Sequence, residues 1–328
     1  MDETQRTNPT PGRSPYSPRH TVRRPRRSAR RSLGAFLAGA LCGLAIALIA
    51  HLVSGGKSPA HHARPLAAVT RGNSRGHSTA PAPVRPAGHS PPEQAPILMY
   101  HVINPPPPGA PFPGLYVPKE EFAEQMHALK AAGYVAVTLS ELAANWREGA
   151  PLPAGKPVVI TFDNGYRSQY ENALPVLREL GWRAVENIQL SGLPPSQGGL
   201  TEEQVRGLLA AGWELDTQGY SHAELTALSP AQLHFQIAVA RQTLQARYHV
   251  PVNWFCYPSG HYDQQVIEAV KQAGFIGSTT VIPGWAGPQS EPYRLPRIRV
   301  LGGTSGPQLL SLIEASLPLP PPPPAYTS

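Results

Sequence analysis

Residues 96–317 of this 328-residue chain are predicted to form an α/β domain, either a parallel (β/α) barrel or a doubly wound sheet. Short apolar segments and helical patterns alternate through this range, which is long enough for one large domain. The β-branched run 158–162 is typical of a strand buried on both faces. It ends abruptly in Asp163, Asn164 and Gly165, and ligands bind at the carboxyl ends of strands in α/β folds. The fold class therefore also predicts where the functional site lies.

The first 95 residues differ from the rest of the chain in charge. They hold 14 basic and 3 acidic side chains, a net charge of +11, whereas residues 96–328 carry −4, which together give +7. The high isoelectric point therefore belongs to the N-terminal arm. The folded part lacks the basic surface of a nucleic-acid-binding domain, so we expect no nucleic-acid partner.

An apolar segment follows the arginines of the N-terminus. Residues 33–53 contain no Asp, Glu, Lys or Arg, and 21 residues at ~1.5 Å each span roughly 30 Å, the thickness of a bilayer core. We therefore expect a basic cytoplasmic tail over 1–32, a transmembrane anchor over 33–53 and an extracytoplasmic domain in the cell membrane. A cleaved signal peptide stays open as the alternative, with weak cleavage positions at Ala47, Ala50 and Ser54.

Two further segments have biased composition. Residues 54–95 are rich in Pro, Ala, Ser, Gly and His, which predicts a disordered linker. The Pro-rich tail 318–328 is interpreted as a tether or as having no role. Cys42 and Cys256 are the only cysteines and are not expected to pair, so the domain depends on its core rather than on disulfides.

The first elements of the domain follow from apolar spacing and from glycines. Residues 97–100 predict a strand, and residues 118–132 predict a helix with an apolar stripe that ends before a glycine. Residues 134–138 predict a strand, and Ser140 is expected to open a helix. The strand 158–163, a helix over 170–180 and a strand over 184–190 follow.

Capping residues mark the helices of the second half. Thr201 and Ser229 each begin a capping box, which predicts helices to Gly212 and to about Arg247. Asp263 is expected to cap a helix that ends at Gly274. The strands predicted between and after these helices are 214–216, 253–257, 276–281 and 295–300.

Three polar segments fall at predicted strand ends, namely 162–165, 216–222 and 255–263. Their order and spacing resemble the polysaccharide deacetylases of the NodB-like homology family, carbohydrate esterase family 4. The resemblance covers roughly residues 96–300 and includes Leu98-Met99-Tyr100-His101, Gly212-Trp213-Glu214-Leu215 and the loop Tyr257-Pro258-x-Gly260-x-Tyr262-Asp263. It implies a distorted (β/α)7-type barrel that hydrolyses the carbon–nitrogen bond of N-acetylated sugars in a cell-envelope polysaccharide or peptidoglycan.

The resemblance also implies roles for single residues. In the family a zinc-like divalent ion acidifies the attacking water and polarises the acetyl carbonyl. Asp163 matches the general base and His222 matches one metal ligand, whereas Asn164 and Gln218 stand at the other two ligand positions. Neutral amides are poor zinc ligands, and without an ion the pKa of water stays near ~15.7 rather than ~7. General-base assistance of about 10²–10⁴-fold does not replace the metal. A divalent metal is thus a doubtful cofactor, and a weak or absent site is expected.

The third motif also departs from the family. Its arginine position is Cys256, its tyrosine position is Ser259, and no histidine after residue 261 matches the family's general acid. A rearranged ligand set stays open as an alternative, and its candidates are Asp163, Asp216, Glu186 and His261. Both His101 and His261 are interpreted as loop histidines rather than catalysts.

Sugar contacts are expected from the third loop and from one tryptophan. Tyr257, Pro258, Ser259 and Gly260 are the predicted substrate-binding residues of the loop, and Trp285 is the predicted stacking residue. Asp163 is expected to lie at an exposed strand end.

Three hypotheses follow from the sequence. The leading one is a membrane-anchored, extracytoplasmic deacetylase-like hydrolase that acts on N-acetylated glycans. The alternatives are a catalytically inactive glycan-binding protein on the same fold and an envelope scaffold that uses the Pro-rich segments.

Overall fold

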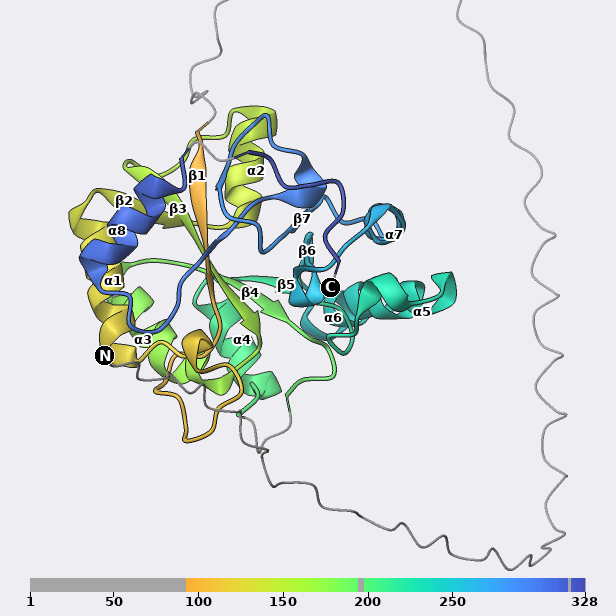
Figure 1. The fold of residues 1–328 in the computed structure, drawn as a ribbon, viewed down its shortest axis with the longest axis horizontal. Coiled ribbons are helices and arrows are strands. Elements are labelled where there is room, and N and C mark those ends of the chain that lie inside the picture. Colours follow the sequence, from red (N-terminus) through yellow and green to blue (C-terminus); the bar gives the residue numbers. More distant parts are fainter. Residues whose placement is uncertain (1–92, 194–197, 318–319, 328) are drawn as a thin grey trace, which may run out of the picture. The chain divides into compact units, whose positions relative to one another are not determined.

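The computed structural model describes residues 93–193, 198–317 and 320–327 (Figure 1). The predicted cytoplasmic tail, anchor and nearly all of the linker lie outside these ranges. Within the described ranges, no helix is both long enough and apolar enough to cross a membrane.

A curled parallel sheet forms the centre of the domain. Its strands run in the order β7-β6-β5-β4-β3-β1-β8, and β2 pairs with β3. The pairs among β1 to β7 are parallel, whereas β8 is antiparallel to the start of β1. The strands are β1 (Ala95–Tyr100), β2 (Tyr134–Val137), β3 (Lys156–Asn164), β4 (Val185–Ile188), β5 (Glu214–Thr217), β6 (Trp254–Cys256), β7 (Gly277–Thr279), β8 (Trp285–Ala286) and β9 (Ile298–Arg299).

The segment 295–299 connects the two sides of the curled sheet. Leu295 forms a parallel bridge with Thr279 of β7, and β9 pairs in parallel with β1. The predicted α/β class and parallel sheet are confirmed. The expected distorted barrel is found as a curled half-barrel, in which the strands on this side contribute only two or three residues each.

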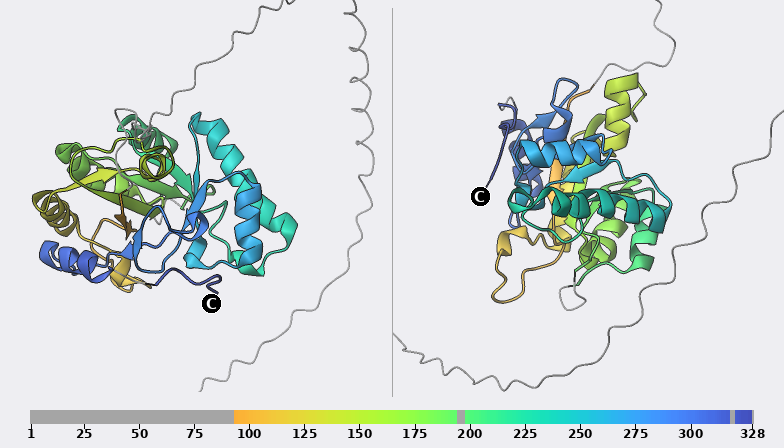
Figure 2. Two further views of the ribbon diagram at one scale, coloured as in Figure 1. Left: turned by 90° about the horizontal axis from the view of Figure 1, so that it is seen from above. Right: turned by 90° about the vertical axis from the view of Figure 1, so that its right-hand side faces the viewer.

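Helices cover the outer faces of the sheet (Figures 1 and 2). In Figure 1, α1, α3 and α8 lie on one flank of the sheet, and α5, α6 and α7 lie on the other. The α-helices are α1 (Lys119–Ala131), α2 (Leu139–Glu148), α3 (Leu174–Leu180), α4 (Glu202–Ala210), α5 (Pro230–His234), α6 (Ala240–Tyr248), α7 (Gln264–Gln272) and α8 (Gly306–Ala315). Segments of π-helix, Gln169–Ala173 and Phe235–Val239, precede α3 and join α5 to α6.

Local sequence signals set most helix ends. The capping boxes predicted at Thr201 and Ser229 are present, and Asp263 caps α7. One start was predicted wrongly, because α2 begins at Leu139 under a capping box formed by Thr138 and Glu141. Neither α8 nor β8 was predicted.

Alternate residues of β3 face two different environments. Val158, Ile160 and Phe162 belong to the cluster that packs against residues of α1, α3 and α8, whereas Val159 belongs to a cluster shared with Val185 of β4 and Trp254 of β6. On the face of β3 that carries Val159, the side chains nearer the carboxyl end of the strand are polar. The apolar layer therefore ends before the carboxyl edge of the sheet and leaves that edge to polar groups.

Candidate functional site

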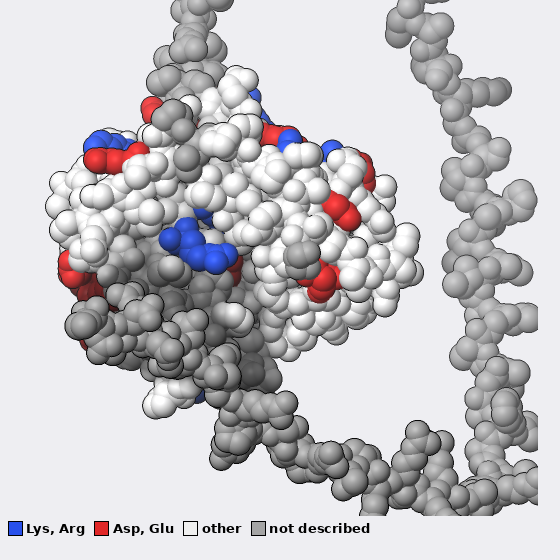
Figure 3. Space-filling model, viewed as in Figure 1, with Lys and Arg blue, Asp and Glu red and all other residues white. Residues whose placement is uncertain are grey.

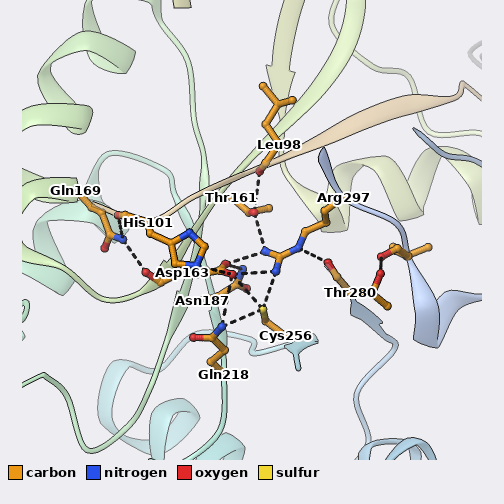
Figure 4. Close-up of polar contacts among 11 residues, drawn as sticks. Leu98, His101, Thr161, Asp163, Gln169, Asn187, Gln218, Cys256, Thr280 and Arg297 are labelled. Atoms are coloured by element: carbon orange, nitrogen blue, oxygen red, sulfur yellow. Dashed lines mark hydrogen bonds and ion pairs between the residues drawn. The ribbon is translucent and has the colours of Figure 1, made fainter. Parts of the chain in front are cut away.

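An ion pair between Asp163 and Arg297 forms the centre of the site (Figure 4). Asp163 lies near the carboxyl end of β3, and its two carboxylate oxygens accept hydrogen bonds of 2.8 and 2.9 Å from Nη1 and Nη2 of Arg297. Asp163 is 1% exposed and Arg297 is 0% exposed. The expectation of an exposed carboxylate was wrong, since residues from across the sheet cover this strand end.

Arg297 is held at every nitrogen of its guanidinium. It belongs to the closing segment 295–299, and its Nε donates to the carbonyl of Thr280 at 2.8 Å. Its Nη1 also donates to Thr161 Oγ1 at 3.0 Å, and its Nη2 lies 3.2 Å from Cys256 Sγ. A buried guanidinium with all donors engaged is fixed in both position and charge.

The neighbouring strands supply the other partners of Asp163. Asn187 is its register partner on β4, and Asn187 Nδ2 donates to Oδ1 at 2.9 Å. Gln218, just after β5, approaches Oδ2 at 3.5 Å, and Cys256 Sγ of β6 lies 3.6 Å from the same oxygen. Each carboxylate oxygen therefore has at least two polar neighbours within the protein, which uses most of its accepting capacity.

These contacts determine the protonation of the group. Burial favours the neutral acid, but the charge and hydrogen bonds of Arg297 outweigh it and lower the pKa of Asp163 to about 2. Burial raises the pKa of the Cys256 thiol to about 12, so this thiol stays protonated at neutral pH. Asp163 is therefore a permanent carboxylate and a weak base.

His101 follows β1 and faces this ion pair (Figure 4). Its Nε2 lies 4.0 Å from Asp163 Oδ2, and its Nδ1 has no hydrogen-bond partner among the described residues. Gln169 donates to the main-chain carbonyls of both His101 and Asp163, at 2.8 and 2.9 Å, and so fixes the two strand ends together. Burial lowers the pKa of His101 to about 4 in spite of the nearby carboxylate, so the imidazole is neutral at pH 7. His101 lies in the loop after β1, as predicted, and whether it takes part in catalysis stays open.

The three expected metal-ligand positions do not form a zinc site. Gln218 turns its amide nitrogen toward Asp163 and Cys256, and it donates to Cys256 Sγ at 3.4 Å. Asn164 and His222 are only half-buried, and burial lowers the pKa of His222. No group of three or more His, Cys, Asp or Glu side chains able to hold a metal occurs in the described part of the chain. The donor set therefore does not fit the ion that the family implies.

The rearranged ligand set is not assembled either. Asp216 accepts hydrogen bonds from the main-chain amides of Asn253 and Trp254, and His261 contacts Glu224 at 2.6 Å. Glu186 is the register partner of Phe162, so it lies on the opposite face of the sheet from Asp163.

Backbone strain marks the same edge of the sheet. Asn164, His222 and Ser259 have φ values of 78°, 51° and 55°; Asn164 is the last residue of β3, and the other two follow β5 and β6. Non-glycine residues rarely adopt this left-handed region, and such strain gathers at functional sites. Three of the four strained non-glycine residues among those described thus belong to the three motifs singled out in the sequence.

The residues predicted to bind sugar in the third loop differ in their exposure. Tyr257 is buried, donates to the carbonyl of Tyr293 at 2.9 Å and so belongs to the core. Pro258 and Gly260 are also buried, which leaves only Ser259 exposed on this loop.

Trp285 lies at the wrong end of the sheet for sugar stacking. It pairs with Pro96 near the beginning of β1, away from the carboxyl edge, and its Nε1 donates to Ile313 at 2.9 Å. The prediction of Trp285 as a stacking residue is therefore wrong, because the segment that resembles a loop in the sequence forms strand β8.

Charged side chains are sparse on the face shown in Figure 3, where most of the described surface is uncharged. The few basic and acidic groups on this face are scattered rather than gathered into a broad patch. This distribution is consistent with a neutral ligand rather than with a polyanion.

Comparisons with known proteins agree with the fold and the motifs. Residues 152–277 match a family model described as Polysaccharide deacetylase. The Bacillus subtilis (strain 168) protein YxkH, assigned to the polysaccharide deacetylases, is 31% identical over 224 residues, which cover 68% of this chain and 77% of YxkH. The Streptococcus pyogenes deacetylase PplD, solved in complex with acetate, superposes with a TM-score of 0.62 at 26% identity and covers 68% of this chain and 99% of its own.

A shorter match involves the poly-β-1,6-N-acetyl-D-glucosamine N-deacetylase of Escherichia coli (strain K12). It is 42% identical over 62 residues, which is 19% of this chain and 9% of the E. coli protein.

Proposed function

This chain belongs to the polysaccharide deacetylase family, the NodB-like carbohydrate esterases of family 4, and we propose that its domain binds N-acetylated cell-envelope glycans. We further propose that it does not hydrolyse them with the help of a metal. The substrate class is that of the family. The absence of metal-assisted hydrolysis is proposed from the side chains of this chain.

The observation that carries the proposal is the saturated ion pair. Asp163 stands at the position of the family's general base, but its two oxygens are occupied by Arg297, Asn187 and Gln218. A base must offer a lone pair to the attacking water, and its pKa must lie near the working pH. A carboxylate with a pKa of about 2 and most of its accepting capacity in use fits these conditions poorly. Asp163 is better suited to ordering the site than to moving a proton.

Unused polar atoms surround this ion pair and suit an acetamido group. Gln218 Oε1, Asn187 Oδ1 and His101 Nδ1 are buried and have no partners among the described residues. Amide oxygens can accept a hydrogen bond from the N–H of an acetamido group, and a protonated ring nitrogen can donate to its carbonyl. Buried polar atoms without partners are unfavourable, so a ligand that pairs with them gains affinity.

The test measures binding and hydrolysis on the same preparation. Purified full-length chain in mild detergent is titrated with hexamers of N-acetylglucosamine linked β-1,4 or β-1,6, and acetate release is followed with added zinc or chelator. We expect binding of at least one hexamer and no zinc-dependent release of acetate. Release that chelator abolishes and zinc restores would overturn the proposal in favour of a metal-dependent deacetylase.

A second candidate function is slow, metal-free deacetylation with His101 as the base. The observation in its favour is geometric: Nε2 lies 4.0 Å from a fixed carboxylate, and Nδ1 has no partner among the described residues. The low pKa of the imidazole limits this base and is the reason that only slow turnover is proposed. A general base contributes about 10²–10⁴-fold. Acetate release that resists chelator and disappears in His101→Gln would establish this activity.

We also propose that residues 33–53 anchor the protein in the cell membrane with the domain outside. Support comes from the length of the apolar segment and from the nine arginines that precede it. Fractionation of C-terminally tagged full-length protein is expected to give full-mass protein in the membrane fraction. A soluble species that begins near residue 54–64 would instead identify a cleaved signal peptide.

A further inference from the structure

The C-terminal segment 320–327 is docked on the domain and is not a loose tether. Tyr326 and Tyr262 exchange two main-chain hydrogen bonds of 2.7 and 2.8 Å in an antiparallel bridge. Tyr262 Oη donates to the carbonyl of Pro323 at 2.7 Å, and Arg294 Nη1 donates to the carbonyl of Pro322 at 2.9 Å. Prolines have no N–H to offer, so these carbonyls are the polar groups by which such a segment can be held.

The docking place adjoins the candidate site. Tyr262 belongs to the loop that leaves β6 after Cys256, whose Sγ lies 3.6 Å from Asp163. The Tyr326 ring lies 5.7 Å from the His261 ring, and His261 Nδ1 lies 2.6 Å from Glu224 Oε2. Glu224 comes two residues after His222. The tail thus continues a chain of contacts that joins the loops after β5 and β6.

The exposed groups along this chain have the chemistry of a sugar subsite. Tyr326 is 38% exposed and the Glu224 side chain is 39% exposed. An aromatic ring packs against the C–H face of a pyranose, and a carboxylate accepts strong hydrogen bonds from its hydroxyls.

We propose that residues 320–327 form a wall of the glycan site, where Tyr326 and Glu224 bind a sugar unit beyond the one that lies at Asp163. This inference rests on the proposed function, because it assigns a second subsite to the same glycan. It predicts that the tail contributes to the binding of long chains and not of short ones.

The test compares chain lengths on the full-length protein. Calorimetry measures the affinity of wild type, Tyr326→Ala and Tyr326→Phe for the disaccharide and the hexasaccharide of N-acetylglucosamine. A chain that ends after Leu319 is measured beside them. Leu317→Ala removes another exposed apolar side chain and is the control, since Leu317 precedes the docked segment.

We expect Tyr326→Ala and the shortened chain to bind the hexasaccharide about five- to tenfold more weakly. Their affinity for the disaccharide should stay within about twofold of wild type, and Tyr326→Phe and Leu317→Ala should bind both ligands as wild type does. An unchanged hexasaccharide affinity in Tyr326→Ala, or an equal loss for both ligands, would overturn the second subsite. If wild type binds neither ligand, the proposed function itself fails and this inference fails with it.

Discussion

Replacing Arg297 by methionine keeps an unbranched, flexible side chain and removes the charge that pairs with Asp163. In the native structure this guanidinium makes both hydrogen bonds of the bidentate pair, at 2.8 and 2.9 Å, in a fully buried position. The variant leaves a carboxylate in the same apolar surroundings with only the weaker dipoles of Asn187 and Gln218. We expect Arg297→Met to destabilise the domain strongly at pH 7.

The magnitude follows from the pKa of the carboxyl group. A pKa of about 2 in place of 3.8 corresponds to about 2.5 kcal/mol of stability at neutral pH. That figure is a lower bound for the loss, because without Arg297 burial would raise the pKa of Asp163 above 3.8. Breaking a buried ion pair from one side costs about 3–5 kcal/mol. Asp163→Asn with Arg297→Met removes both charges, so it should cost less than the sum of the single changes by about 2–3 kcal/mol.

The assay is urea unfolding of the two single variants and the double variant at several pH values. In Arg297→Met the folded state holds a proton on Asp163 more readily than the unfolded chain does. Its stability relative to wild type should therefore increase as the pH falls from 7 toward 5. In wild type the Asp163 contribution is present above about pH 4 and is lost only as the pH falls toward 2. A loss below about 1 kcal/mol in Arg297→Met, with additive effects in the double variant, would refute the reasoning.

Three further predictions concern single features of the site and its surroundings. The double change Asn164→Asp with Gln218→His should create zinc binding that calorimetry detects, whereas nanomolar binding by wild type, roughly −12 kcal/mol, would contradict the assigned ligand positions. Burial lowers the pKa of His101 from 6.5 to about 4. The contribution of His101 to stability is therefore present above pH 6.5 and is lost as the pH falls from 6.5 to about 4. Urea unfolding should therefore show that the free energy of unfolding of His101→Gln, relative to wild type, increases by about 2–3 kcal/mol from pH 7 to pH 4.5. A difference between the two proteins that does not depend on pH would contradict this. Burial raises the pKa of Glu186, whose two oxygens have no partners among the described residues, so its ionisation costs stability as the pH rises. Glu186→Gln should raise the melting temperature more at pH 8 than at pH 5, and an equal shift at both would exclude ionisation as the cause.

Most elements were predictable from the sequence because their signals are local. The capping boxes at Thr201 and Ser229, and the glycines after helical stripes, fix helix ends without reference to the rest of the chain. The position of Asp163 was predictable for a similar reason, since an abrupt end to a buried strand is visible in a few residues. The half-barrel was not predictable from residues alone, because it depends on which short strands pair across the closing side.

Arg297 was missed because its partner lies 134 residues earlier in the chain. The resemblance places the family's arginine at Cys256, and in the structure the guanidinium of Arg297 contacts the Sγ of this residue. Two arginines, Arg297 and Arg299, inside the otherwise apolar segment 295–300 were the available signal, since a buried guanidinium requires a carboxylate. His101 carried a signal as well, because it lies at the carboxyl end of a strand, β1, as Asp163 does on β3. The prediction for Trp285 was wrong because nothing in its loop-like sequence indicates a pairing with Pro96.

During biosynthesis the closing segment 295–299 follows all of the strands β1 to β8. Until Arg297 leaves the ribosome, a nascent domain that already contains β3 to β6 would hold Asp163 as an unpaired charge, and its sheet would expose the edges of β1 and β7. Contacts of such long range form slowly and make completion of the domain a single late event. Chains truncated before residue 295 should therefore be aggregation-prone substrates for chaperones and proteases rather than smaller working domains.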